Sequence, residues 1–190
     1  TIVGQRWRTR DDLCGARPFA LNFNGWGSLE WLMNELDESQ RLHLAPKVIA
    51  NALGLVTKDS DYVLPPAQGL DFGANNGLDM LTCAVAVPTR RCVEAIDLIA
   101  NVCREMAKRS IYLSSPVGVR FAKGYSATTH PWLAPQFGEL TTMIELAGFR
   151  QVRCSNEALS RLMRELADHC GARLHWGQTL PDWFDGAARR

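Results

Sequence analysis

Residues 117–123 read Val-Gly-Val-Arg-Phe-Ala-Lys, an alternation that is typical of a β-strand. If the large apolar residues share one face, Arg120 lies on the other face between Gly118 and Ala122. A guanidinium between such small neighbours has room to reach a ligand, where it orients an oxygen atom or stabilises developing negative charge. Arg120 is therefore a candidate catalytic and substrate-binding residue. The alternative is an exposed arginine on the solvated face of a sheet.

A second candidate site is the run His175-Trp176-Gly177-Gln178, which follows a helix expected to end at Gly171. Glycine allows a backbone to approach a planar ring closely, and the two aromatic side chains offer polarizable surface. The run is a candidate for binding a planar ligand. The alternative is a terminal strand that packs on the core.

A third candidate is the loop after residue 123, which contains Tyr125, His130 and Trp132. Loops between strands often carry substrate contacts, so these side chains are candidate substrate-binding residues, although such loops are also common as plain surface. The glycine-rich stretch at residues 72–77 lacks the spacing of a phosphate-binding loop and is interpreted as a turn.

Several catalytic classes have no motif in this chain. It contains no GxSxG nucleophile elbow and no HExxH zinc motif, and its cysteines and histidines do not have metal-ligand spacing, so no metal is expected. No glycine loop for a dinucleotide is present either, so the chain is not expected to bind FAD or NAD by itself.

Composition sets further limits. The 190 residues carry a net charge of +1 and are 46% hydrophobic, which favours one folded unit over a disordered chain and disfavours nucleic acid as a partner. No apolar run is long enough for a transmembrane segment. Six cysteines without a CxxC pair suggest reduced thiols and a cytoplasmic location. The start at Thr1, with neither a Met nor a signal peptide, suggests a piece of a longer protein.

Hydrophobic periodicity predicts the elements that position these residues. A helix is expected from Ser28, which would act as its N-cap, and a second at residues 45–55, ending near Gly54. After a loop at residues 57–77, we expect strands at 78–87, 117–123 and 140–149 and helices at 89–110 and 155–170, the last capped by Ser155. The apolar face of the helix at 89–110 is predicted to comprise Cys92, Val93, Ile96, Ile99, Ala100, Cys103 and Met106.

This order predicts an α+β fold, an antiparallel sheet with helices on one face in the ferredoxin-like split βαβ plan. Residues 78–190 would form the core with the His-Trp-Gly motif. Residues 1–77 would add an N-terminal arm, two helices and a loop to the same domain.

Three motifs occur in a suggestive order: a strand ending Val87-Pro88, the strand Pro116-Val-Gly-Val-Arg-Phe121, and a C-terminal Gly171-Ala-Arg-Leu-His-Trp-Gly-Gln178. Together they resemble the C-terminal substrate-binding (cap) half of the FAD-linked sugar-lactone and alditol oxidases, including the D-arabinonolactone and L-gulonolactone oxidases, of the vanillyl-alcohol oxidase superfamily. The likeness extends over about residues 78–178.

The resemblance implies a cap domain over a separate FAD-binding domain or subunit, with the sheet as the roof of a pocket for an alcohol-bearing substrate. It implies hydride transfer to flavin, with Arg120 at the family's active-site arginine and with His175, Trp176, Gly177 and Gln178 contacting the cofactor. The isolated chain would not be active. The alternative is a non-catalytic ligand-binding or protein-interaction module with a ferredoxin-like fold.

Two positions depart from the family pattern. The family has Glu two residues before the arginine, where this chain has Gly118, and Lys after His-Trp-Gly, where this chain has Gln178. The first change removes a hydrogen-bond acceptor for substrate hydroxyls, and the second removes a positive charge. Both changes affect the specificity expected for lactones or alditols.

Overall fold

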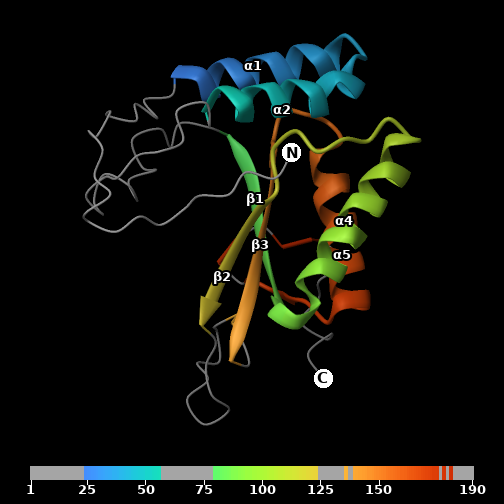
Figure 1. Cartoon of the computed structure of the whole chain (residues 1–190). Helices are drawn as coiled ribbons and strands as arrows, with labels where there is room; N and C mark the ends of the chain where they lie inside the picture. The colour runs from blue at the N-terminus through green and yellow to red at the C-terminus, as the bar shows by residue number, and fades with distance from the viewer. Residues whose placement is uncertain are drawn as a thin grey trace, which may run out of the picture.

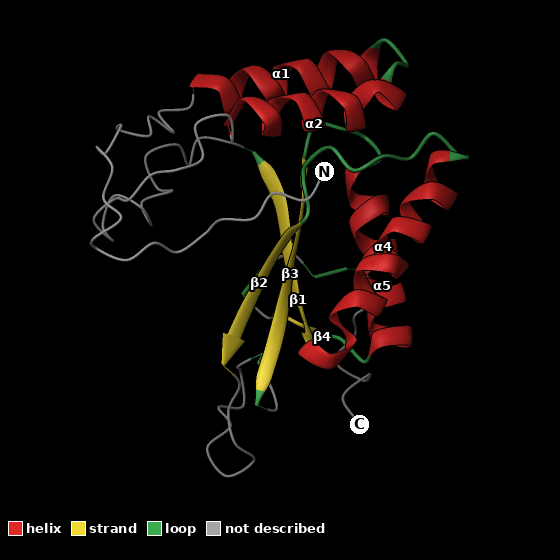
Figure 2. Ribbon diagram, in the orientation of Figure 1, coloured by secondary structure: helices red, strands yellow, loops and turns green. Residues whose placement is uncertain are grey.

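The structure is a computed structural model that describes residues 24–56, 79–123, 135–136, 139–175, 177–178 and 180–181. Within these ranges four strands form one antiparallel sheet in the order β2-β3-β1-β4: β1 (Met80–Pro88), β2 (Gly118–Lys123), β3 (Leu140–Phe149) and β4 (Arg173–Leu174). Helix α4 (Cys92–Ala107) follows β1, and α5 (Ser155–Cys170) follows β3 (Figure 2). The chain order β-α-β-β-α-β confirms the predicted α+β class and split βαβ plan.

Helices α4 and α5 lie on one face of the sheet (Figure 1). Alternate residues of the central strands point toward them, including Val85 and Val87 from β1 and Ile144 and Leu146 from β3. The buried residues of α5 include Leu159, Leu162, Met163 and Leu166, at steps of three and four residues. Each such side chain contributes about 1.5–3 kcal/mol on burial, so this layer holds the sheet rigid.

The predicted apolar face of α4 is wrong in part. A short 3-10 turn, Thr89–Arg91, precedes the helix. The buried residues of α4 are Cys92, Ala95, Ile99, Val102 and Met106. By contrast Val93 is 72% exposed and Ile96 is 42% exposed. Apolar residues extend around more of α4 than its contact with the core covers, so periodicity alone did not select the buried stripe.

An N-terminal helical pair lies across one end of the sheet (Figures 1 and 2). It consists of α1 (Asn24–Glu38) and α2 (Ala45–Val56), joined through a 3-10 turn at Leu42–Leu44. The predicted start of the first helix is wrong, because α1 begins before Ser28, which is therefore not its cap. The second helix, predicted at residues 45–55, spans Ala45–Val56, with Gly54 inside it. A glycine in a helix costs about 1 kcal/mol, which packing can offset.

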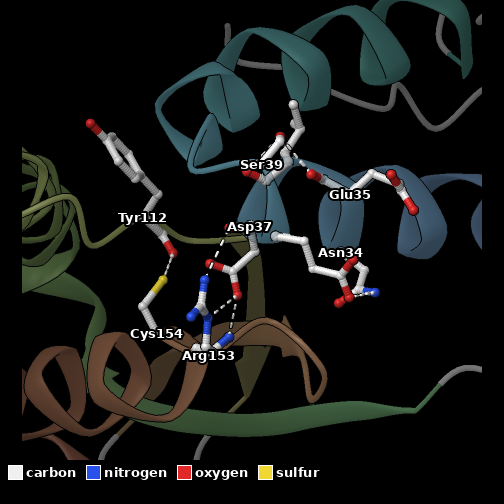
Figure 3. A network of polar contacts seen from close by, with 9 residues as sticks. Asn34, Glu35, Asp37, Ser39, Tyr112, Arg153 and Cys154 are labelled. Carbon is white, nitrogen blue, oxygen red and sulfur yellow. Dashed lines mark hydrogen bonds and ion pairs between the residues drawn. The ribbon is translucent and has the colours of Figure 1, made fainter.

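The helical pair has its own core against the sheet end. Met33 from α1 and Ile49 from α2 belong to one buried cluster. The cluster also contains Phe149, the last residue of β3, and Val152, which lies just after that strand. Figure 3 shows the polar link beside this cluster: Asp37 Oδ2 accepts a hydrogen bond from the backbone N–H of Arg153 at 2.8 Å, and Arg153 Nη2 donates to the Asp37 carbonyl at 3.1 Å.

The two ends of α5 match the prediction unequally. Gly171 ends the helix with φ of 61°, the left-handed conformation that glycine adopts without strain, as expected. The predicted Ser155 cap is wrong, because Cys154 occupies the cap position and no side chain caps the helix. Ser155 is buried instead, with its Oγ 3.1 Å from Ser114 Oγ.

The described part of the chain contains no helix long and apolar enough to cross a membrane. Its five cysteines, Cys83, Cys92, Cys103, Cys154 and Cys170, are free thiols. Among the same residues, no group of three or more His, Cys, Asp or Glu side chains is placed to hold a metal ion.

Candidate functional site

The candidate site is the sheet face opposite α4 and α5, and strand register sets its layout. Residues paired directly across antiparallel strands point to the same face. One row across this face runs Arg120, Met143, Ala86 and Arg173. The next row runs Gly118, Glu145 and Ala84, and His175 continues it by donating its backbone N–H to the Ala84 carbonyl at 2.9 Å.

Arg120 lies on this face, as the alternation predicted. Its guanidinium forms an ion pair with Glu145, which comes from the neighbouring strand β3. The Arg120 side chain is 65% exposed and that of Glu145 is 40% exposed, so both remain accessible to a ligand. At one edge of the face, the pair thus places the several N–H donors of Arg120 beside the Glu145 carboxylate, which accepts hydrogen bonds from hydroxyl groups.

Gly118 provides the space that the Glu145 side chain occupies. A Cβ atom at position 118 would lie 3.3 Å from both Glu145 Cβ and Glu145 Oε2, closer than most Cβ contacts. The glycine therefore lets the carboxylate lie against β2 beside Arg120. Two residues before Arg120 on its own strand there is no carboxylate, but the face still carries one.

The middle of the face is apolar and buried. Ala84 is 2% exposed, Ala86 is fully buried and Met143 is 5% exposed, and Ala122 packs against them. The apolar middle of the face, between the charged edge at Arg120 and the opposite edge at His175, is therefore buried. At about 4.8 Å per strand, the row from Gly118 to His175 spans about 14 Å, the scale of a fused-ring ligand.

Gly177 lies against the ring of His175. The Gly177 N–H donates to His175 Nδ1 at 3.1 Å, and a Cβ atom at 177 would lie 3.1 Å from His175 Cε1. Since Nδ1 accepts this bond, the neutral imidazole carries its proton on Nε2. His175 thus presents a donor at its free ring nitrogen.

Gln178 follows in the same turn, with its backbone N–H donating to the His175 carbonyl at 3.4 Å. Its side-chain Oε1 is buried and has no hydrogen-bond partner among the described residues. A buried acceptor without a partner costs free energy, so it identifies a place where a donor from outside the described residues would be favourable.

Four of the predicted site residues, Tyr125, His130, Trp132 and Trp176, lie outside the described residues, as does the predicted turn at 72–77. The structure therefore brings together Arg120 at one edge and His175, Gly177 and Gln178 at the other. On α5, outside this face, His169 Nε2 lies 3.4 Å from Glu165 Oε2.

Glu145 is the residue that sequence reasoning missed. The signal was present, because it is the single charged side chain in the ten-residue strand Leu140–Phe149. What the sequence lacked was the register that pairs Glu145 with Gly118. Without that register, a lone carboxylate in a strand has no assigned neighbour.

Four of the described cysteines are poor nucleophiles. Burial raises the pKa of Cys83 from 9.0 to about 12, and its side chain belongs to the core beneath α4 and α5. Burial also raises the pKa of Cys103, Cys154 and Cys170. Thiols in this state are protonated at neutral pH and unreactive.

No protein-family model matches the sequence, and no curated protein matches it significantly. The function is therefore inferred from the residues of the face and their geometry.

Proposed function

We propose that this chain is the substrate-binding domain of an FAD-dependent oxidoreductase that removes a hydride from an alcohol-bearing small molecule such as a sugar lactone or an alditol. The sheet face with Arg120 and His175 is the roof of the substrate pocket. The observation that carries the proposal is the Arg120–Glu145 pair beside Gly118, because it supplies from β3 the carboxylate that the resembled oxidases carry on the arginine's own strand.

The pair suits a polyhydroxylated substrate. The Glu145 carboxylate accepts hydrogen bonds from substrate hydroxyls, while the Arg120 guanidinium donates to the oxygen of the reacting carbon. As hydride leaves that carbon, the hydroxyl proton passes to solvent water, and the positive charge of Arg120 holds the oxygen in place and stabilises the negative charge that develops on it. Flavin, when bound, supplies the two-electron acceptor.

The opposite edge fits the polar rim of a flavin. An isoalloxazine carries an N–H donor between two carbonyl oxygens, and this edge offers the buried, unpartnered Gln178 Oε1 as acceptor and the His175 Nε2–H as donor. Gly177 lets the His175 ring lie against the backbone of this turn, which fixes the ring beside Gln178. These residues would hold the cofactor's edge, while an FAD-binding domain or subunit outside this chain would hold its phosphates.

The alternative is a ligand-binding or protein-interaction module without oxidase chemistry. The closed ion pair favours it, because Glu145 already satisfies part of the Arg120 charge and a substrate must compete for that position. The two functions differ in one observable property, the presence of flavin in the complete protein. The free thiols support a cytoplasmic location in either case.

The first experiment records the visible absorption of the complete natural protein that contains this chain, purified without added cofactor. The oxidoreductase proposal expects flavin bands that bleach anaerobically with a sugar lactone or an alditol. A colourless complete protein that neither takes up FAD nor reduces it with any member of that panel refutes the oxidoreductase and supports the binding module.

Variants then test the pair itself. Arg120→Ala should slow anaerobic flavin reduction on the order of a hundredfold, the usual loss for one preorganised donor. The matched control is Arg150→Ala, because Arg150 is also exposed and ion-paired, 2.7 Å from Asp79 Oδ1, but lies at the far end of β3. Equal rates in the two variants would remove Arg120 from the site.

Glu145→Ala should weaken substrate binding, and adding Gly118→Glu should restore part of it, since the carboxylate then returns on the arginine's own strand. Gly118→Glu alone should impair the enzyme, because its Cβ would crowd Glu145. If the double variant is no better than Glu145→Ala, the carboxylate does not act from this face.

A further inference from the structure

A second surface, defined by exposed apolar residues at the edge of the sheet, is separate from the proposed site. Strand β2 is one of the two edge strands of the sheet, and its outer edge pairs with no strand in the described residues. On the helix-facing side of the sheet, Phe121 of β2 is 63% exposed, Val119 is 37% exposed and Leu140 of β3 is 51% exposed. We call these three residues, with Val93 and Ile96 of α4, the edge patch.

The topology brings the five residues to one end of the sheet. Lys123 pairs with Leu140, and Pro88 pairs with Thr141, so β1 and β2 end where β3 begins. Helix α4 starts at Cys92, just after Pro88, which places Val93 and Ile96 at the same level as Phe121. Because α4 links β1 to β2 across β3, the order of the strands places it toward the β2 side of the sheet.

An exposed apolar edge strand is a template for pairing with another strand, because its outward N–H and C=O groups are free to form a ladder. Proteins that remain monomeric usually block such an edge with a proline, a bulge or inward-pointing charge. Strand β2 contains none of these on its helix-facing side before Lys123, where it carries Val119 and Phe121. Within the described residues the edge is therefore unpaired, with Lys123 as the one charge on its helix-facing side, at the end of the strand.

We propose that a second copy of this chain covers the edge patch, through antiparallel pairing of β2 with β2 across a twofold axis at Phe121. The two sheets then form one continuous eight-stranded sheet, with the α4 helices of both copies on the same side. A twofold axis that keeps the helices on one side must pass through a residue position, because only then do helix-facing residues lie opposite helix-facing residues.

The charge of Arg120 favours an axis at Phe121 over an axis at Arg120. An axis at Arg120 would put two guanidinium groups directly opposite each other, which is destabilising. An axis at Phe121 stacks the two phenyl rings, places Arg120 opposite the small Ala122 of the partner, and places Val119 opposite Lys123, whose aliphatic stem covers it. Each Arg120 retains its ion pair with Glu145 of its own copy.

The same axis gathers the rest of the patch. Val93 and Ile96 lie at the level of Phe121 on the side of α4 that the core leaves exposed, so two copies bring four such side chains toward the axis. Their burial explains why α4 carries apolar residues outside its buried stripe. The Arg120–Glu145 pair lies on the opposite face of the sheet and is not part of the edge patch.

The test measures the mass of the purified chain by light scattering on a sizing column over the micromolar range. The wild-type chain should be a dimer, and Phe121→Lys should weaken dimerisation on the order of a hundredfold by removing a central aromatic contact and opposing two ammonium groups. The matched control is Trp31→Lys, because Trp31 is equally exposed at 63% but belongs to α1. This control should leave the dimer intact.

Cysteine cross-linking tests the register. Phe121→Cys places two thiols opposite each other on the axis and should give a covalent dimer on mild oxidation beyond any wild-type background. Val119→Cys should not, because the two Val119 positions lie four residues apart along the paired strands, about 14 Å. A monomeric wild type, a mass that grows beyond two copies, an undiminished Phe121→Lys dimer, or equal cross-linking at both positions would each overturn the proposal.

Discussion

Asp37 forms the polar contact between the N-terminal helical pair and the βαβ core, beside the buried cluster that joins them, and its replacement tests that contact directly. The Asp37 side chain is 12% exposed, and its Oδ2 accepts two hydrogen bonds from Arg153, one from the backbone N–H at 2.8 Å and one from Nε at 3.3 Å (Figure 3). The backbone bond is the shorter one. It joins α1 to the turn that leads into α5.

The expected loss in free energy of unfolding depends on which of the two residues is replaced. A hydrogen bond to a charged group contributes about 1.5–3 kcal/mol, so Asp37→Ala should lower the free energy of unfolding by about 2 kcal/mol. Arg153→Ala keeps the backbone N–H and removes a side chain that is 72% exposed. Exposed ion pairs contribute about 0.2–1 kcal/mol, so this variant should lose about 0.5 kcal/mol. Asp37→Asn should fall between the two, because the amide oxygen still accepts but carries no charge.

The assay is urea unfolding followed by far-ultraviolet circular dichroism, with the slope of the transition compared among variants. The double variant Asp37→Ala/Arg153→Ala should unfold with nearly the stability of Asp37→Ala alone, since both changes act on the same bonds. An Arg153→Ala variant less stable than Asp37→Ala would refute the reasoning, because the guanidinium would then be the principal attachment.

Three other changes have defined outcomes. Gly148→Ala should destabilise the chain by about 1–3 kcal/mol, because its Cβ would lie 2.9 Å from the buried Ser155 Oγ; urea unfolding measures this, and Ser155→Gly added to it should recover part of the loss. Ser114→Ala should cost about 1–3 kcal/mol, because the Phe149 N–H donates to Ser114 Oγ at 2.9 Å and would lose its buried partner; a loss under about 0.5 kcal/mol would mean that water replaces the hydroxyl. The pKa of Cys83 is raised from 9.0 to about 12 by burial, so the stability linked to its protonated thiol is complete below pH 9 and is lost as the pH rises toward 12. The free energy of unfolding of wild type should therefore fall more steeply with pH over that range than that of Cys83→Ala, by about 1.4 kcal/mol per pH unit.

The parts of the fold that the sequence predicted well are those with one dominant local signal. Strand β3 and helix α5 have the predicted bounds, residues 140–149 and 155–170, because a long apolar strand and a strongly amphipathic helix are each unambiguous. The end of α5 at Gly171 follows equally from local chemistry. The antiparallel arrangement followed from the order of these elements.

The errors arose where tertiary contacts outweighed local preference. Ser155 has the residue type of a helix cap, but its hydroxyl is buried against Ser114, a partner 41 residues away in the chain. Val93 and Ile96 continue an apolar pattern that the core does not cover. In both cases the deciding partner is distant in sequence, so no local pattern contains it.

The candidate site shows the same limit at the level of chemistry. Along β2 alone, Gly118 provides no carboxylate beside Arg120, and the strand contains no acidic residue that could take its place. Considered across the sheet, Gly118 is the position that admits Glu145, because a side chain there would occupy the space within 3.3 Å of its Cβ and Oε2. A charged pair on a sheet face can be built along one strand or between two, since paired residues lie as close as residues two apart on a strand. The glycine and the glutamate are therefore one feature of the face, and only the register of β2 on β3 makes that visible.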